Sequence, residues 1–148
     1  MKIACKGFTL VEILITTAIL ALCLCGLLAS YVNMFSLSDL SRDFLQATNA
    51  VQAKTEEIKK TNFDNLSGLN ATAFDIAGFS AGVAKGLVEV SDTAYADLKR
   101  VRVVVCFKSR GRLFGDDTNL NGALNAGEDV NNNGRLDSPA EIVTLIAK

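Results

Sequence analysis

The fold is decided by residues 7–35, which read GFTLVEILITTAILALCLCGLLASYVNMF. A helix needs about 20 predominantly apolar residues to cross a membrane, and this run is longer than that. Between residues 8 and 38 the only charged side chain is that of Glu12. Because a carboxylate inside such a helix costs about 2.5–3.5 kcal/mol on insertion scales, Glu12 is a candidate functional residue that needs a partner.

A short basic segment precedes the apolar run. Residues 1–7 carry Lys2 and Lys6, have no apolar core of their own, and lack the small-residue cleavage site of a secretory signal peptide. Lysines beside a membrane helix stay on the cytoplasmic side, so we expect the C-terminal part of the chain on the opposite side.

The junction KGFTLVE at residues 6–12 resembles the cleavage and methylation motif of type IV pilins and of type II secretion pseudopilins. The resemblance implies that a prepilin peptidase cleaves after Gly7 and that the new amino group of Phe8 is methylated. It also implies that Glu12 neutralises the Phe8 amine of a neighbouring subunit during filament assembly. Two opposite charges in lipid are tolerated as a pair, which agrees with this role.

Two simpler interpretations of the N-terminus are a helix-end acid at Glu12 that reaches the headgroup region, and an ordinary signal anchor. The placement of Gly7, Phe8 and Glu12 after a basic leader favours the pilin interpretation. We therefore predict a leader peptide at 1–7, a transmembrane and assembly helix at 8–36, and a periplasmic or extracellular domain at 37–148.

The globular part has roughly 110 residues, enough for one small core. Its only cysteine is Cys106, so it cannot form the internal disulfide that closes a C-terminal loop in many type IV pilins. The chain has no histidine, and its pattern suggests no activated nucleophile or paired acids. An enzyme is therefore not expected.

Hydrophobic residues continue at helical spacing beyond the apolar run, and no proline or glycine interrupts residues 27–60. We therefore predict one long helix over about 8–60. Proline, which kinks this helix in many pilins, is missing, and its absence favours a pseudopilin or minor pilin over a major subunit. The stripe that repeats at helical spacing consists of Leu37, Leu40, Phe44, Ala47, Val51 and Ile58.

The remaining chain predicts a connecting segment at 64–86 with little regular structure, then strands at 87–90, 98–107 and 141–147. The middle strand is the clearest, because Val101, Val103, Val105 and Phe107 alternate with other residues. Together the elements predict an α+β, pilin-like fold: a long N-terminal helix packed on an antiparallel sheet of three to four strands.

Six basic and no acidic residues lie between positions 99 and 112, namely Lys99, Arg100, Arg102, Lys108, Arg110 and Arg112. They form either a patch for DNA or another anion, or an exposed strand face whose charges prevent edge pairing. No aromatic residues interleave with them on that face, so the second interpretation is favoured and no nucleic acid is expected.

An Asp/Asn-rich loop at 115–138 contains the full spacing of an EF-hand calcium loop, counted from Asp117 as position 1. Calcium prefers six to eight oxygen ligands, a glycine for the sharp turn, here Gly122, and a bidentate glutamate that closes the shell. The candidate ligands are Asp117, Asn119, Asn121, the backbone carbonyl of Ala123, a water held by Asn125, and Glu128.

A partial second copy follows at a twelve-residue interval, with candidate ligands at Asp129, Asn131, Asn133, Arg135 and Asp137, and with Ala140 in place of the closing glutamate. The repeat resembles the calcium repeats of dockerin and thrombospondin type 3 modules. It is either a second, weaker site or one that shares Asp129 and Asp137 with the first. The simpler alternative is a solvated Asn/Gly loop. Because strands flank the loop, EF-hand helices are not expected.

The sequence as a whole is interpreted as a structural filament subunit of a type IV pilus or a type II secretion pseudopilus. Its expected partners are other subunits through the N-terminal helix, the prepilin peptidase and the inner membrane. Some pseudopilins use a C-terminal calcium site in place of the disulfide, and we expect calcium to stabilise the loop here. The alternative is a membrane-tethered minor pilin that acts as an adhesion or DNA-uptake binding module.

Overall fold

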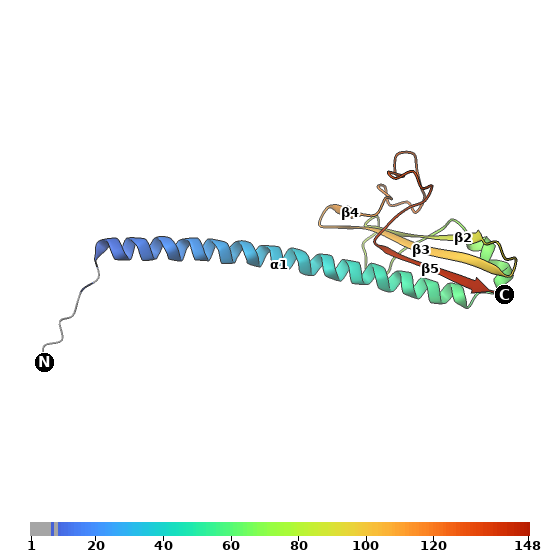
Figure 1. Ribbon diagram of the computed structural model, residues 1–148, viewed down its shortest axis with the longest axis horizontal. Helices are drawn as coiled ribbons and strands as arrows, with labels where there is room; N and C mark the ends of the chain where they lie inside the picture. Colours follow the sequence, from blue (N-terminus) through green and yellow to red (C-terminus); the bar gives the residue numbers. More distant parts are fainter. Residues whose placement is uncertain (1–6, 8) are drawn as a thin grey trace. The chain divides into compact units, whose positions relative to one another are not determined.

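The computed structural model describes Gly7 and residues 9–148 (Figure 1). The chain divides into two compact units, one that ends at Ser38 and one that spans Asp39–Lys148. A single helix, α1 (Leu10–Lys59), contributes to both units. Its bounds confirm the prediction of one uninterrupted helix, since proline is missing from it and its one glycine, Gly26, does not break it.

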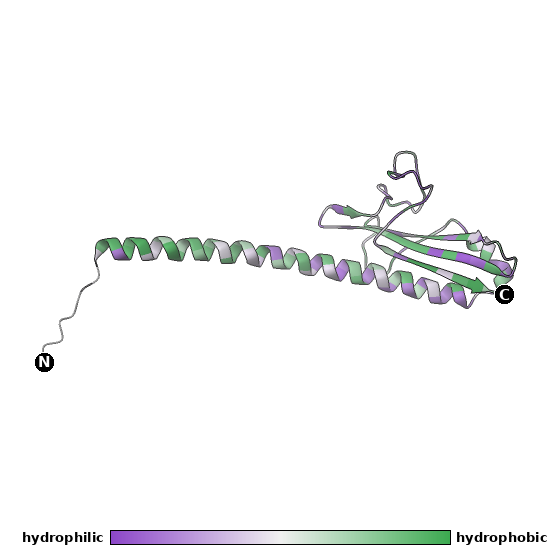
Figure 2. Ribbon diagram, viewed as in Figure 1, coloured by the Kyte–Doolittle hydropathy of each residue, from purple (hydrophilic) through white to green (hydrophobic). Residues whose placement is uncertain are grey.

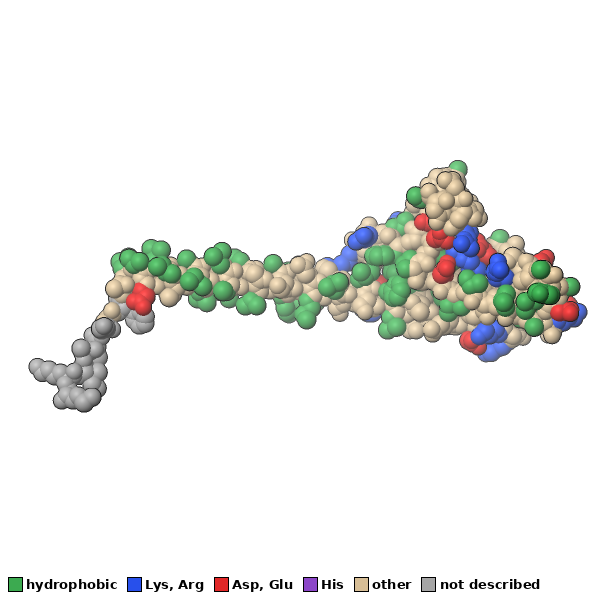
Figure 3. Space-filling model, viewed as in Figure 1, with side chains coloured by type: hydrophobic (Ala, Val, Ile, Leu, Met, Phe, Trp, Pro, Cys, Tyr) green, Lys and Arg blue, Asp and Glu red, His purple; other side chains and the backbone are tan. Residues whose placement is uncertain are grey.

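The first unit consists of the apolar part of α1. Thr9 caps the helix, because the Glu12 backbone N–H donates to the Thr9 hydroxyl at 3.3 Å. By length and composition α1 can cross a membrane, and none of its most apolar window is buried against protein. The hydropathy colours of Figure 2 mark this part of the helix as mostly hydrophobic, and Figure 3 shows hydrophobic side chains at its surface. Within the described residues, this hydrophobic surface therefore has no protein partner.

The second unit packs the polar half of α1 on an antiparallel sheet. Ala47, Val51, Thr55 and Ile58 are the buried residues of the helix, and their spacing of three or four positions keeps them on one face. They meet Val101, Val103, Val105 and Phe107, which alternate along one face of the central strand and are all fully buried. The predicted helix stripe is thus confirmed over Ala47, Val51 and Ile58, whereas Leu37 and Phe44 are exposed.

The sheet has five strands, two of which are only three residues long. They are β1 (Thr72–Phe74), β2 (Ala84–Asp92), β3 (Leu98–Ser109), β4 (Arg112–Phe114) and β5 (Ala140–Ala147). The order is β1-β2-β3-β4, and β5 pairs with β3 alongside residues 98–105. The predicted α+β, pilin-like fold is confirmed. The sheet has five strands where three to four were predicted, because β1 and β4 are too short to show an alternating pattern in the sequence.

The segment after the helix is more ordered than its composition indicates. It contains a 3-10 helix, η1 (Phe63–Leu69), which buries Leu66 completely, and strand β1, which pairs with β2. The expectation of little regular structure over 64–86 was therefore wrong. Small polar residues do not favour a helix or strand on their own. Here burial of Leu66 stabilises η1, and pairing with β2 stabilises β1.

The second face of the sheet is also covered. The loop between β4 and β5 folds back on it, and Leu136 from that loop packs with Leu87 and Val104 in a separate small cluster. Arg102, expected on an exposed face, is only 5% exposed. The prediction of a solvated charged face was wrong at this position, because alternation identifies two faces of a strand but does not show what covers them.

Candidate functional site

The residues of the predicted cleavage motif lie at the start of α1. Gly7 is exposed with open space around it, and Glu12 is exposed in the first turn of the helix. Phe8 lies outside the described residues. The structure therefore places the Glu12 carboxylate on an apolar helix, where no described residue forms an ion pair with it.

The Asp/Asn-rich loop begins and ends at a short neck. The Asp116 backbone N–H donates to the Asp137 carbonyl at 2.9 Å, and the Asp137 N–H donates to an Asp116 carboxylate oxygen at 3.1 Å. These two bonds close the loop beside β3. The candidate calcium ligands of both copies lie between them, except Asp137, which forms part of the neck itself.

The first copy folds around Asp117, which is 0% exposed. Its carboxylate accepts the backbone N–H of Asn121 at 3.1 Å and of Gly122 at 2.7 Å. The side-chain oxygen of Asn119 accepts the N–H of Asn121, and that of Asn121 accepts the N–H of Ala123. The residues predicted at positions 1, 3, 5 and 7 are therefore brought together by successive side-chain to backbone bonds.

Glu128 closes this copy from the other end. One carboxylate oxygen accepts the N–H and the hydroxyl of Thr118, at 2.9 and 2.6 Å. The other accepts the backbone and side-chain N–H groups of Asn125, at 2.9 and 3.1 Å. These bonds, led by that from the Thr118 hydroxyl, lower the pKa of Glu128 to about 2. Glu128 is therefore ionised at neutral pH, although the residue is only 4% exposed.

The second copy repeats this arrangement. The Asp129 carboxylate accepts the N–H of Asn133 at 2.9 Å and of Gly134 at 2.7 Å. Asn131 bonds to the N–H of Asn133, and Asn133 bonds to the N–H of Arg135, as their counterparts do twelve residues earlier. The Asp137 carboxylate, at position 9, accepts hydrogen bonds from the side-chain amides of Asn131 at 2.7 Å and Asn133 at 2.6 Å.

The backbone repeats as well. Position 4 of each copy has a positive φ on a residue other than glycine, 56° at Leu120 and 55° at Asn132. Position 6 is a glycine with φ of 75° in both, Gly122 and Gly134. A left-handed conformation is unfavourable for a residue with a Cβ atom, so the same turn in both copies reflects the shared Asp/Asn pattern.

The first copy has the donor chemistry that calcium requires, since all its candidate ligands are oxygens. No lysine or arginine of the described chain pairs with Asp117 or Glu128, although both are buried. Two buried carboxylates with only neutral hydrogen-bond donors leave negative charge without a counterion. Among the described residues no three His, Cys, Asp or Glu side chains gather at a metal-binding distance, so an ion here needs amide and backbone oxygens too.

Arginine side chains reach the second copy, unlike the first. Arg102 donates to Asp137 at 3.3 Å, and Arg135 approaches the same carboxylate at 3.7 Å. The amide of Asn131 is the main cause of a lowered pKa at Asp137, and the two arginines add to it. Because Asp137 already has cationic partners, the second copy fits a metal less well than the first.

Sequence reasoning missed Arg102 as the centre of a polar cluster. Its guanidinium bonds to Glu89 at 2.8 Å, to Glu141 at 2.6 Å and to the Leu136 carbonyl. Burial lowers the pKa of Arg102, but the bonds to the two glutamates outweigh it and raise the value overall. The available signal was the placement of Glu89 and Glu141 in the two strands that flank β3, on the face that carries Arg102.

Comparison with known proteins supports the N-terminal assignment. Residues 3–28 match a family model described as the prokaryotic N-terminal methylation motif. The match includes Gly7, Phe8 and Glu12, and supports the resemblance to type IV pilins and pseudopilins. No curated protein and no solved structure matches the chain.

Proposed function

We propose that the chain is a prepilin, a structural subunit that assembles through α1 into a type IV pilus or a type II secretion pseudopilus. The observation that carries the proposal is the methylation motif at the start of a long helix whose apolar surface has no partner among the residues that the structure describes. Such a surface is stable in a membrane or against equivalent helices of other subunits. Proteins with this motif are expected to pass from the membrane into a filament, so they meet both environments.

Processing is the first step of this function. Gly7 is exposed and open, as a peptidase needs, and cleavage after it gives Phe8 a new amino group. No described residue of the chain forms an ion pair with the Glu12 carboxylate. In the membrane the Phe8 amine of a neighbouring subunit would supply the missing positive charge. The pairing offsets the cost of a charge in an apolar layer and so fixes the axial position of one helix beside another.

Calcium is the proposed stabiliser of the loop between β4 and β5. Asp117, Asn119, Asn121, the Ala123 carbonyl and Glu128 would hold the ion, which supplies the positive charge that the two buried carboxylates lack. Few of these ligands are charged, so we expect a weak site of about 0.1–1 mM, suited to an extracytoplasmic compartment. The site would keep Leu136 and its loop on the second face of the sheet.

The finer assignments rest on separate features. The absence of proline from α1 supports a minor pilin or a pseudopilin. For the second loop copy, a weaker calcium site fits the repeated turn, but the arginines at Asp137 oppose it. The alternative of a DNA-uptake module has less support, because Arg102 forms ion pairs with Glu89 and Glu141 and is not available to bind phosphates.

Co-expression with a prepilin peptidase tests the proposal. The expected result is a shorter chain that begins at Phe8, and loss of that product in the Gly7→Val variant, because a branched side chain would then stand at the residue before the cut. Ala4→Val is the matched control and should be processed normally. A chain that keeps residues 1–7 in the presence of an active peptidase would contradict the proposal.

A further inference from the structure

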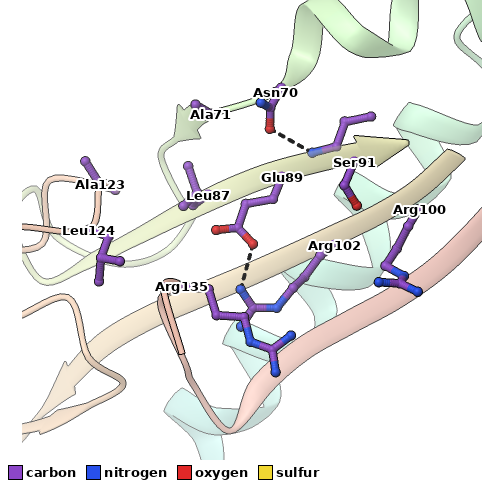
Figure 4. Close-up of a pocket in the computed structure, with 13 residues that line it drawn as sticks. Asn70, Ala71, Leu87, Glu89, Ser91, Arg100, Arg102, Ala123, Leu124 and Arg135 are labelled. Atoms are coloured by element: carbon purple, nitrogen blue, oxygen red, sulfur yellow. Dashed lines mark hydrogen bonds and ion pairs between the residues drawn. The ribbon is translucent and has the colours of Figure 1, made fainter. Parts of the chain in front are cut away.

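An open pocket of about 560 Å³ lies where the two loop copies meet the second face of the sheet (Figure 4). The first copy contributes residues 122–124 and the second contributes residues 134–135, which in each case begin at the glycine of the repeated turn. Strands β2 and β3 form the floor. Each copy therefore presents the same part of its turn to one shared space.

The pocket has a cationic side. Arg100 and Arg102 from β3 and Arg135 from the loop line it, with one lining carboxylate, Glu89. Arg102 is fully used, because Glu89, Glu141 and Asp137 all accept its hydrogen bonds. Arg135 is 56% exposed and only approaches Asp137 at 3.7 Å.

Among the three arginines that line the pocket, Arg100 is the one whose guanidinium has no partner. The residue is exposed, and its side chain forms no ion pair or hydrogen bond with the described residues. Its guanidinium can donate two parallel hydrogen bonds to a carboxylate, a geometry that lysine cannot provide.

The other side of the pocket is apolar. Figure 4 shows Ala71, Leu87, Ala123 and Leu124 together, apart from the three arginines. Beyond the pocket the sheet face stays open, because Leu145 pairs with Arg100 across β3 and β5 and is 55% exposed. Val143, two residues earlier, is 52% exposed. An occupant larger than the pocket therefore finds aliphatic surface on which to continue.

We infer that this pocket binds an extended segment of another protein chain that carries an acidic residue between aliphatic residues. The carboxylate would pair with Arg100 and Arg135, and an aliphatic neighbour would fill the space beside Leu87 and Leu124. Glu89 does not take this place, because its carboxylate is held by Arg102 at 2.8 Å. The inference depends on neither the calcium site nor the filament assignment.

The test is a titration of the full chain, isotope-labelled in lipid nanodiscs, with the peptide acetyl-Leu-Asp-Leu-amide, followed by NMR. We expect resonance shifts at the pocket residues, and binding at least about tenfold weaker for the isosteric Asn peptide, which lacks only the charge. Arg100→Gln and Arg135→Gln should each weaken binding of the Asp peptide. The matched control, Arg42→Gln, replaces an exposed arginine on α1 and should not.

Each of three results would overturn the inference: no binding of the Asp peptide, equal binding of the Asp and Asn peptides, or unchanged binding in Arg100→Gln. Tighter binding of N-acetylleucine than of the peptide would assign the pocket to a small carboxylic acid instead. Since the variants change exposed side chains, unchanged spectra elsewhere establish that they are folded. The titration is repeated with calcium and with chelator. Peptide binding that is the same in both conditions shows that the pocket does not depend on the calcium site, so either proposal can fail without the other.

Discussion

Replacing Glu128 by glutamine tests what holds the loop on the sheet. Glutamine keeps the size of the side chain but has one acceptor oxygen in place of two. Either the Thr118 groups or the Asn125 groups must then face an amide N–H₂ that cannot accept their hydrogen bonds. The negative charge that a calcium ion would need is removed as well.

The magnitude follows from the pKa of Glu128. A shift from 4.5 to about 2 corresponds to an upper limit of about 3 kcal/mol in folding free energy. Because glutamine keeps one of the two acceptor oxygens, the expected loss for Glu128→Gln is below this limit, at about 2 kcal/mol without calcium. For a domain of this size that lowers the Tm by roughly 10 °C.

Calcium adds a second, separable effect. At about tenfold excess over its Kd the ion stabilises the wild-type fold by about 1.4 kcal/mol, and it should not stabilise Glu128→Gln. Circular dichroism melts of the full chain, with calcium and with chelator, measure both effects. Asp75→Asn, an exposed acid outside the loop, is the control. If calcium raises the Tm of wild type and Glu128→Gln equally, or of neither, the calcium site as described is wrong.

The pH dependence of stability has a defined sign. Because folding lowers the pKa of Glu128, its contribution is present above pH 4.5 and is lost as the pH falls towards about 2. The wild type should therefore lose more stability than Glu128→Gln over that window.

Three further predictions concern other parts of the chain. Arg102→Met should cost about 2–4 kcal/mol, because it leaves the carboxylates of Glu89 and Glu141 without their cationic partner, and urea denaturation measures the loss. Gly122→Ala should destabilise by about 2–3 kcal/mol, since its Cβ would lie 2.6 Å from that of Ala73, whereas Gly134→Ala, with the same φ of 75° and open space, should cost about 1 kcal/mol in thermal melts. Glu12→Ala should still be cleaved but should fall at least about tenfold in sheared filaments, measured by immunoblot, because the charge pair between helices is lost; equal amounts of variant and wild type would contradict this role.

The elements that depend on local pattern were predictable from the sequence. The helix follows from an unbroken run without proline, and its end near Lys59 is within one residue of expectation. Strand β3 follows from alternating valines. The calcium-type spacing predicted which residues of the first loop copy would come together, since Asx turns are formed between near neighbours in sequence.

The features that depend on distant contacts were not predictable in this way. Nothing in the pattern of β3 shows that a loop from after β4 returns to cover Val104 and Arg102. That path depends on the neck between Asp116 and Asp137, which are 21 residues apart. Strands β1 and β4, with three residues each, take their structure from the neighbour with which they pair and have no periodicity of their own.

Intact-mass spectrometry of sheared filaments and of the membrane fraction tests the central claim most directly. The proposal predicts a chain that begins at methylated Phe8 in both fractions, and its minor-subunit form predicts that the chain is scarce in filaments. An abundant processed chain in filaments would make it a principal pilin and would contradict only that finer assignment. A chain that still carries residues 1–7 would contradict the prepilin function itself.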